Sequence, residues 1–434
     1  MRSDLVPLEF SGIQRLLEKL TATPYGAEAA RNIEPAPDAA VARRMQNAVS
    51  AARGLIERGA APRLHAVADI RAALRQAAQS GAALTGTALY HIRSVMKIAG
   101  ELQAIVQETP NLFPGAPTQL APPPALIAHM DRVVQANGGI RPDASARLQD
   151  LHAQAQVARA AVTAALEQRL RAADTAVTAE RMAWQGHRGM LALPPPLAEK
   201  IKGVRRPGAN EKTVLIEPME AVALNNRLEA IAGQQNQEHQ QLRRALTDAV
   251  RADGVALQQI LDALTWIDLA LAGGHLSVHL NAAEPELVSD AVIILDRAYH
   301  PAMLLQFAER RGPQPVPLSL TLDAQQPMLV ITGPNTGGKT VVLKTIGVLT
   351  TMAYCGLHIP SEGRCVIGDF NRVIVGIGDA QNLYHHLSTF AGHVEVLKRL
   401  VNEADAGSLV LIDELGTGTD PEEGAALAMA VLDE

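Results

Sequence analysis

Cysteine and aromatic residues are scarce in this chain of 434 residues. Its two cysteines, Cys355 and Cys365, have no second pair to complete a zinc site or a disulfide framework, which fits a reducing compartment. Aromatic residues make up 3% of the chain, whereas the strands of β-sandwiches are enriched in aromatic and β-branched residues. The composition therefore favours long helices over a β-sandwich.

An excess of positive charge and a long apolar run are also missing. The formal net charge is -6, so contact with a nucleic acid would need a local basic patch. The first five residues are not followed by the apolar segment of a secretory signal, and the best apolar stretch, 341–360, contains Lys344. With 47% hydrophobic and 19% charged residues, we expect a globular, cytoplasmic protein with no membrane partner.

The length of the chain predicts two to four domains, at roughly 150 residues per domain. Residues 5–110 carry apolar side chains at helical spacing, and a proline-rich stretch at 111–124 marks a boundary. We therefore expect a mainly α-helical core domain over 1–124.

Two long helices are expected in the next region, 125–283. Apolar residues from Leu148 to Leu166 step by three and four, the seam of a coiled-coil-like helix that runs to about residue 181. A second helical tract spans about 221–271, and its middle is almost wholly polar, as in a solvated rod. At ~1.5 Å per residue, about 35 helical residues span about 50 Å, enough for an antiparallel pair that projects from the body.

Between these helices, residues 186–218 break the helical period with proline and glycine, which predicts strands or loops at the tip of the pair. The tip is locally basic. A solvated loop would carry such side chains, and so would a surface that contacts nucleic-acid phosphates. The candidate contacts are Lys200, Lys202, Arg205, Arg206 and Lys212.

From about residue 284, short continuous apolar runs replace the helical pattern. They lie at 287–288, 291–295, 328–331 and 409–412, separated by helical patterns. Such runs suggest strands buried on both faces of a largely parallel sheet. We therefore expect an α/β domain over 284–434.

The sharpest motif is a phosphate-binding loop, G-x-x-x-x-G-K-[ST], between the strand-like run 328–331 and a helical pattern at 341–349. Its amides would point at the phosphates from a helix N-terminus. Lys339 is expected on the β- and γ-phosphates of ATP and Thr340 on Mg²⁺. The plainer alternative is a glycine turn that enters a helix. The motif consists of Gly333, Pro334, Asn335, Thr336, Gly337, Gly338, Lys339 and Thr340.

A second chemical element lies 74 residues beyond Lys339, where the apolar run 409–412 ends in Asp413 and Glu414. A buried strand of this kind delivers Asp413 to the metal at its carboxyl end, and it leaves Glu414 placed to act as general base on the attacking water. The two motifs together predict a nucleoside triphosphatase, best of all one that engages its nucleotide in a dimer.

The nucleotide loop and its flanks, 331–340, resemble those of the MutS family of mismatch-repair ATPases. Leu-Ser-Thr-Phe at 387–390 resembles the signature segment of that family, and 413–421 resembles its metal-binding strand and following loop. Thr336 and the sequence Gly-Leu-His-Ile-Pro at 356–360 are similar to the branch called MutS-two. The likeness is strong over about 285–434 and weaker towards the N-terminus. It implies a P-loop ATPase domain of the ABC type, which binds ATP and Mg²⁺.

The resemblance also implies a homodimer in which the signature segment of one protomer completes the ATP site of the other. Ser388 would then reach the γ-phosphate held by the other protomer, or it would serve as the N-cap of the helix that follows. Asp420 would contact its counterpart across the interface, and Gln381 would sense the magnesium. The histidines that flank the signature are expected on a helix surface: His385, His386 and His393.

By the same resemblance, the two long helices correspond to lever arms and 186–218 to a DNA-embracing clamp, although this clamp is less basic than is usual in the branch. The Phe-x-Glu wedge of mismatch-reading members occurs only at 307–309, in the wrong domain, so we do not expect mismatch recognition. After the metal-binding strand, the ATPase fold requires a further helix and strand, and the sequence stops inside that helix, at 426–434. We therefore expect a truncated product without the Smr nuclease module of the branch, in which ATP binding does not ensure hydrolysis.

The favoured hypothesis is an ATP-hydrolysing dimeric clamp on branched or recombination-intermediate DNA, acting in DNA repair and suppression of recombination. The alternative is a ribosome-associated ATPase that binds rRNA in stalled or collided ribosomes. A structural ATPase of the chromosome-organising kind is disfavoured, because such proteins insert their helical arms between the two nucleotide motifs. A transporter ATPase is disfavoured by the lack of a Leu-Ser-Gly-Gly signature.

Overall fold

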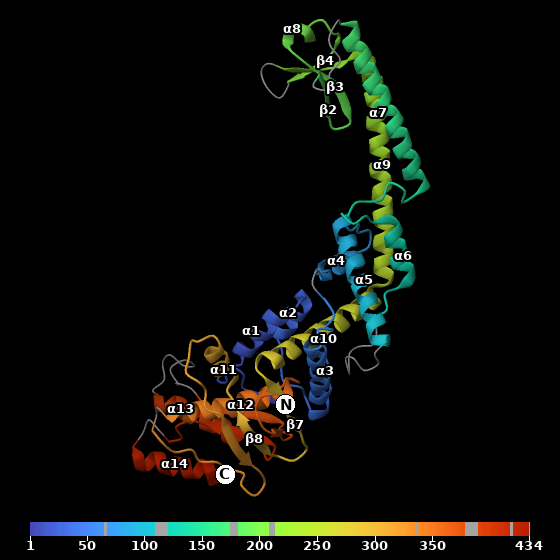
Figure 1. The fold of residues 1–434 in the computed structure, drawn as a ribbon. Helices are drawn as coiled ribbons and strands as arrows, with labels where there is room; N and C mark the ends of the chain where they lie inside the picture. The colour runs from blue at the N-terminus through green and yellow to red at the C-terminus, as the bar shows by residue number, and fades with distance from the viewer. Residues whose placement is uncertain are drawn as a thin grey trace. The chain divides into compact units, whose positions relative to one another are not determined.

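The computed structural model describes residues 1–64, 67–108, 120–173, 181–207, 213–334, 337–377, 389–416 and 420–433. The structure is mainly helical with several small sheets, in agreement with the predicted multidomain chain. It forms two compact units (Figure 1). The first comprises Met1–Asp69, Ile98–Ala121 and Gln258–Glu434, and the second comprises Ile70–Lys97 and Pro122–Leu257.

Two long antiparallel helices dominate the second unit, α7 (Ala146–Ala172) and α9 (Met219–Ala252). At the start of α7, Ser145 caps the helix and donates a 2.8 Å hydrogen bond to Glu238, just past the middle of α9. Towards the end of α7, Leu170 packs in one apolar cluster with Ala221, at the start of α9. The helix α9 ends before Asp253, where the sequence pattern predicted one continuous tract to residue 271. Shorter helices of this unit are α4 (Arg71–Ala78) and α6 (Pro124–Val133), while α5 (Gly86–Glu108) belongs to both units.

Four strands between residues 182 and 218 form a small antiparallel sheet, here called the tip sheet. Its strand order is β2-β3-β5-β4, and a short helix, α8 (Pro195–Ala198), follows β3. Leu191 and Ile216 of the sheet are fully buried against Val162 and Leu166 of α7. The bounds are β2 (Met182–Gln185), β3 (Arg188–Leu193), β4 (Gly203–Pro207) and β5 (Val214–Pro218).

A buried polar network fixes the tip sheet to α9. The side chain of Asn225, which has no exposed surface, accepts a hydrogen bond from Gly189 N and donates one to Gly189 O, both at 2.9 Å. The same amide donates to Glu217 at 2.8 Å, and Arg188 pairs with that carboxylate at 2.7 Å. The oxygen and nitrogen of the Asn225 side chain thus both have partners inside the protein. Its amide pairs with Gly189 of β3 as the backbone of a neighbouring strand would.

Helices α1 (Ser11–Leu20), α2 (Pro24–Arg31), α3 (Ala39–Glu57) and α10 (Gly254–His279) belong to the first unit apart from the first turn of α10. Asp268 of α10 is 1% exposed and accepts hydrogen bonds from the amide and the hydroxyl of Thr23, at the start of α2. Among the described helices, α10 is the one long and apolar enough to cross a membrane, but 56% of its most apolar window is buried within the protein. A core helix has the same property.

The ATPase motifs lie in the part of the first unit that contains its sheets. The three-stranded sheet β1-β12-β13 is parallel throughout, and Leu349 and Met352 of α12 are buried in one core with Val373 of β12 and Leu411 of β13. The bounds are β1 (Arg2–Ser3), β12 (Arg372–Gly376), β13 (Ser408–Ile412) and α12 (Lys339–Tyr354). The outer helices are α11 (Pro301–Ala308), α13 (Thr389–Glu403) and α14 (Pro421–Asp433).

A second sheet of this unit is mixed, which corrects the expectation of a largely parallel arrangement. Its order is β7-β11-β8-β9, and β8 runs antiparallel to both of its neighbours. The buried residues of β8 alternate at its start, as in a strand with one face on the core and one in solvent. The bounds are β7 (Glu286–Leu287), β8 (Ile293–Ala298), β9 (Leu318–Leu322) and β11 (Val366–Ile367); a separate antiparallel pair joins β6 (Ala282–Ala283) to β10 (Ile359–Pro360).

The apolar run 328–331 is not a strand in this structure, so that prediction was wrong. Met328, Leu329 and Val330 are 54%, 48% and 69% exposed. A strand needs a hydrogen-bonded neighbour for its amides and carbonyls. Among the described residues, none pairs with this run, and its first three side chains lie largely in solvent while Ile331 is half-buried.

A buried histidine links three elements of the first unit. His358 is 4% exposed, and its ring nitrogens lie 2.7 Å from the hydroxyl of Ser277 in α10 and 2.8 Å from that of Ser50 in α3. Burial, with a smaller contribution from the nearby Arg53 charge, lowers the pKa of His358 to about 4. The imidazole is therefore neutral in the folded protein at neutral pH.

We predict that His358 makes folding stability fall as the pH drops. Because its pKa is about 4 when folded and about 6.5 when unfolded, the unfolded state binds the extra proton between these values. The contribution is complete above pH 6.5, and about 2 kcal/mol of it is lost by pH 5. Urea unfolding at pH 7.5 and 5.0 should show this extra loss in the wild type and not in His358→Asn. An equal pH effect in both proteins would contradict the assignment.

We also predict that Asn225→Ala loosens the tip sheet. The substitution removes the partners of the buried amide and carbonyl of Gly189 and one donor to Glu217. We expect the free energy of unfolding to fall by about 2–3 kcal/mol. Limited proteolysis should then cleave within 182–218 faster than in the wild type. Asn226→Ala is the matched control, because that neighbour makes a single partly exposed bond to Arg188 and should change little.

Candidate functional site

Two glycines give the loop before α12 its shape. Gly333 has φ 148° and Gly338, which caps α12, has φ 83°, both in the region that side chains disfavour. Gly337 N donates to Pro334 O at 2.8 Å, and Val342 N donates to Gly338 O at 3.0 Å, which starts the helix. The backbone amides of the first turn lie at the N-terminus of a 16-residue helix, where the helix dipole favours an anion. Asn335 and Thr336 lie outside the described residues.

Lys339 and Thr340 are the first two residues of α12. The ammonium of Lys339 donates to Gly333 O at 2.6 Å, so it lies across the mouth of the loop. The hydroxyl of Thr340 donates to Asp413 Oδ2 at 2.5 Å. The two motifs that are far apart in the sequence therefore meet in the fold. Hydroxyl and carboxylate oxygens are the ligands that Mg²⁺ takes from proteins in nucleotide sites, so this pair fits a shared magnesium ion.

The carboxylates Asp413 and Glu414 follow directly on β13. The amide of Asp413 donates to Gly376 O of β12 at 3.0 Å, which continues the strand pairing by one residue and fixes where the side chain begins. Glu414 is exposed and has φ 55°, an unusual conformation for a residue with a side chain. Such backbone strain is common at functional sites, where the surrounding structure holds it in place.

The loop after the carboxylates leads into α14. Asp420 is exposed, and its side chain accepts a 2.9 Å hydrogen bond from Glu422 N, so it caps this helix. Its predicted contact with a second protomer stays a prediction. Ser388 and Gln381, as well as His385 and His386, lie outside the described residues, and the side chain of His393 in α13 also lies outside them.

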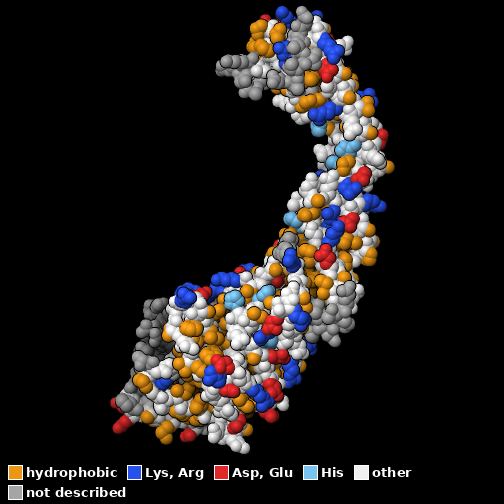
Figure 2. All heavy atoms as spheres, viewed as in Figure 1, with side chains coloured by type: hydrophobic (Ala, Val, Ile, Leu, Met, Phe, Trp, Pro, Cys, Tyr) orange, Lys and Arg blue, Asp and Glu red, His pale blue; other side chains and the backbone are white. Residues whose placement is uncertain are grey.

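The four described basic candidates of the second unit lie in solvent. Lys200 and Lys202 are exposed after α8, and Arg205 and Arg206 are exposed on β4, an edge strand of the tip sheet. Within the described ranges none of the four is in an ion pair, and Figure 2 shows basic side chains on this part of the surface. They are thus available to a phosphate backbone. Lys212 lies outside the described residues.

Sequence reasoning missed two contributors to the site. The carbonyl of Gly376, at the end of β12, accepts a hydrogen bond from the Asp413 amide. Asp4 lies on the other edge of β12, where its side chain accepts a hydrogen bond from Val375 N. No local sequence pattern predicts the role of Gly376 or of Asp4, because both roles depend on strand pairing between distant segments. Among the described residues, no group of three or more His, Cys, Asp and Glu could hold a metal by itself.

Comparison with known proteins places this geometry in a family. Residues 329–434 match the family model for MutS domain V. Endonuclease MutS2 of Symbiobacterium thermophilum is 33% identical over 437 residues, which cover 98% of this chain and 53% of the relative. The same-named protein of Geobacillus thermodenitrificans is 32% identical, with 98% and 55% covered. That of Carboxydothermus hydrogenoformans is 35% identical over 313 residues, with 71% and 39% covered.

The chain spans about half the length of the curated relatives it matches over nearly its whole extent. The match to domain V covers the loop, Thr340 and Asp413 whose contact was described above. Taken together, these similarities identify the chain as a member of the MutS2 branch of the MutS family.

Proposed function

We propose that this chain binds ATP with Mg²⁺ at residues 333–340 and hydrolyses it. The observation that supports this most is the bond between Thr340 and Asp413, because it joins a phosphate-binding helix terminus to a metal-binding carboxylate. Membership of a family whose domain V is the ATPase domain agrees with this chemistry.

Each residue of the site has a proposed task. The first amides of α12 and the ammonium of Lys339 bind the phosphate oxygens and offset negative charge that develops on the transferred group. Thr340 and Asp413 would hold Mg²⁺, which neutralises phosphate charge when bound. Glu414 lies exposed at the end of β13, where it can orient a water and accept its proton. We further propose that Ser388 of a second protomer completes the site, so that the active form is a homodimer.

We propose duplex or branched DNA as the macromolecular partner, bound through the tip sheet, in DNA repair and suppression of recombination in the cytoplasm. The proposed layout is a helical core at 1–124, lever helices with a clamp at 125–283, and the ATPase domain at 284–434. Exposed Lys200, Lys202, Arg205 and Arg206 support phosphate contact without base readout. The polar network at Asn225 would transmit movement between the sheet and α9. A ribosomal RNA would offer the same phosphates, so it is the alternative outcome of the test.

Lys339→Ala and Glu414→Gln should separate binding from turnover. Removal of the ammonium takes away a charge-assisted contact to phosphate, and we expect the Kd for ATP to rise on the order of 100-fold. Glu414→Gln keeps the shape of the side chain but not its basicity, so the Kd should stay within about 2-fold while kcat falls on the order of 10²–10⁴-fold. Fluorescence titration and steady-state kinetics measure the two effects. Equal loss of binding in both variants would refute this division of tasks.

Alanine at Lys200, Lys202, Arg205 and Arg206 together should weaken DNA binding and flatten its salt dependence. Each lost phosphate contact reduces the slope of log Kd against log salt by about 0.9, so the slope should fall by up to about 3–4. The control removes the same charge from exposed residues elsewhere: Lys19, Arg44, Arg58 and Arg75. An equal effect in the control would place the contact elsewhere.

The choice of partner is tested by stimulation of the ATPase. We expect four-way-junction DNA, and to a smaller extent duplex DNA, to raise kcat in the wild type and not in the fourfold tip variant. Stimulation by ribosomes with none by DNA would overturn the DNA proposal and favour the ribosomal alternative.

A further inference from the structure

The outer edge of β12 is completed by side chains instead of by a strand. One edge of β12 pairs with β13 along its whole length, from Arg372 to Gly376. On the other edge, β1 supplies only Arg2 and Ser3, opposite Arg372 and Val373. The last backbone bond of this ladder runs from Asp4 N to Val373 O at 3.2 Å.

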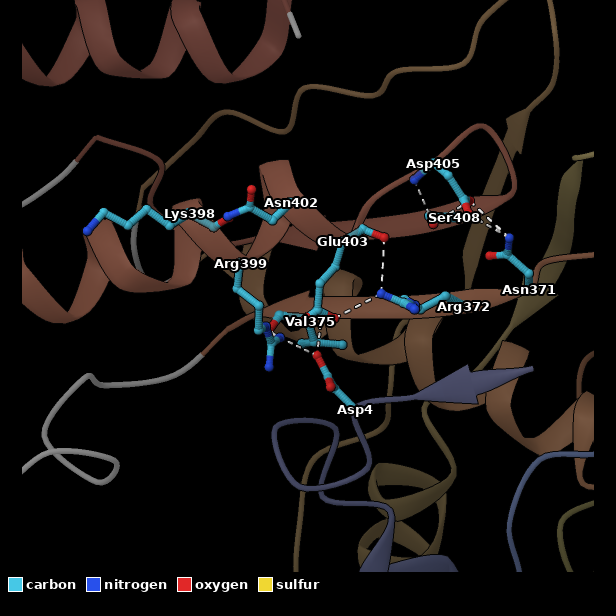
Figure 3. Close-up of polar contacts among 10 residues, drawn as sticks. All are labelled: Asp4, Asn371, Arg372, Val375, Lys398, Arg399, Asn402, Glu403, Asp405 and Ser408. Atoms are coloured by element: carbon cyan, nitrogen blue, oxygen red, sulfur yellow. Dashed lines mark hydrogen bonds and ion pairs between the residues drawn. The ribbon is translucent and has the colours of Figure 1, made fainter.

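Beyond that point, two side chains continue the ladder (Figure 3). Asp4 Oδ2 accepts a 2.9 Å bond from Val375 N, as the carbonyl of a further strand residue would. Arg399 of α13 donates to Val375 O at 3.4 Å, as a strand amide would, and also to Asp4 Oδ2. Both polar groups of Val375 on this edge therefore have partners, although β1 has already ended.

The energetics of this pair indicate a role in strand register. The side chains of Asp4 and Arg399 are 30% and 41% exposed, and an ion pair at such a site contributes about 0–1 kcal/mol to stability. The positions of these two side chains matter more than their charges. Each side chain also forms a hydrogen bond with a backbone group of Val375. Loss of Asp4 would leave Val375 N without its acceptor and free β12 to shift.

That shift would reach the nucleotide site in two steps. Gly376 follows Val375, and its carbonyl on the opposite edge accepts the bond from Asp413 N at 3.0 Å. Asp413 in turn accepts the 2.5 Å bond from Thr340. A continuous series of contacts thus joins Asp4 to the pair of oxygens that fits Mg²⁺.

We propose that Asp4 and Arg399 are positioning residues for ATP hydrolysis: they complete the outer edge of β12 and so hold Asp413 in place beside Thr340. This inference rests on the proposed ATPase function. It predicts that the N-terminal segment acts on the metal-dependent step and not on the binding of the nucleotide phosphates by the loop. A displacement near 1 Å at such a site costs on the order of 10–100-fold in rate.

The test compares Asp4→Ala with Asp4→Asn. Alanine removes the acceptor for Val375 N, and we expect kcat to fall at least 10-fold and the Mg²⁺ concentration for half-maximal rate to rise at least 3-fold. The Kd for ATP measured in EDTA should stay within 2-fold. Asparagine keeps an acceptor oxygen and should restore kcat to within 3-fold of the wild type. Hydrogen exchange over 372–376, followed by mass spectrometry without nucleotide, should accelerate in Asp4→Ala only.

Glu403→Ala is the matched control. It breaks the 2.9 Å ion pair between Glu403 and Arg372, which joins the same helix α13 to the same strand (Figure 3). Arg372 lies at the opposite end of β12 from Gly376, whose carbonyl accepts the bond from Asp413 N. We expect kcat and the Mg²⁺ requirement to stay within 2-fold of the wild type. Equal losses in Asp4→Ala and Glu403→Ala, or wild-type behaviour of Asp4→Ala, would overturn the inference.

Two further outcomes keep the test decisive. If Asp4→Ala does not fold, Arg399→Ala takes its place, because it removes the partner of Val375 O but leaves Asp4 as acceptor; a loss of kcat of at least 3-fold with unchanged ATP binding in EDTA is expected, and no loss overturns the inference. A wild-type protein without any ATPase activity would overturn the proposed function itself, which is a different result from an active wild type with an unaffected Asp4→Ala.

Discussion

The candidate nucleotide site depends on one hydrogen bond, from Thr340 at the start of α12 to Asp413 at the end of β13. It can form only where a helix N-terminus and the carboxyl end of a parallel strand meet, and close packing brings them there. A methyl group at Gly347 of α12 would lie 2.4 Å from Leu8 Cδ2 and 2.8 Å from Leu411 Cδ1, which is too close for ordinary contact. The core of the first unit thus includes the N-terminal segment, although that segment is more than 300 residues from the motifs it supports.

Polar groups, and not apolar area alone, decide the local geometry in both units of the chain. In the first unit, Asp4 and Arg399 extend a strand edge that β1 leaves unfinished. In the second unit, the amide of Asn225 pairs with both polar groups of Gly189 and attaches the tip sheet to α9. A hydrophobic cluster tolerates small slides, whereas a satisfied buried hydrogen bond has one good geometry. The proposed clamp and the proposed ATPase would therefore each have a fixed attachment.

The family assignment gives these local devices a common setting. The relatives named Endonuclease MutS2 are about twice as long as this chain, and domain V accounts for residues 329–434. The long antiparallel helices and the small sheet belong to the second unit, whereas the helix terminus proposed to bind phosphate belongs to the first. The proposed nucleotide contacts and the proposed nucleic-acid contacts therefore lie on different units of the chain.

The sequence by itself determined the local features of this protein. The three- and four-residue spacing from Leu148 to Leu166 predicted a long helix there, because a helix buries one stripe of side chains. The motif at 333–340 predicted a loop that enters a helix, and the run 409–412 predicted the strand that comes directly before Asp413. Each of these features depends on neighbours within a few residues, so the local sequence pattern is enough to predict it.

Only the tertiary structure decided which strands pair and which side chains complete the edges of those strands. The runs 291–295 and 328–331 are both wholly apolar, yet the residues from Ile293 form an antiparallel strand and Met328, Leu329 and Val330 lie exposed. Asp4 has no motif around it and still contacts the strand that holds Asp413. Hydrogen bonds between backbones are the same for every residue, so their partners are set by long-range packing, which no local sequence pattern records.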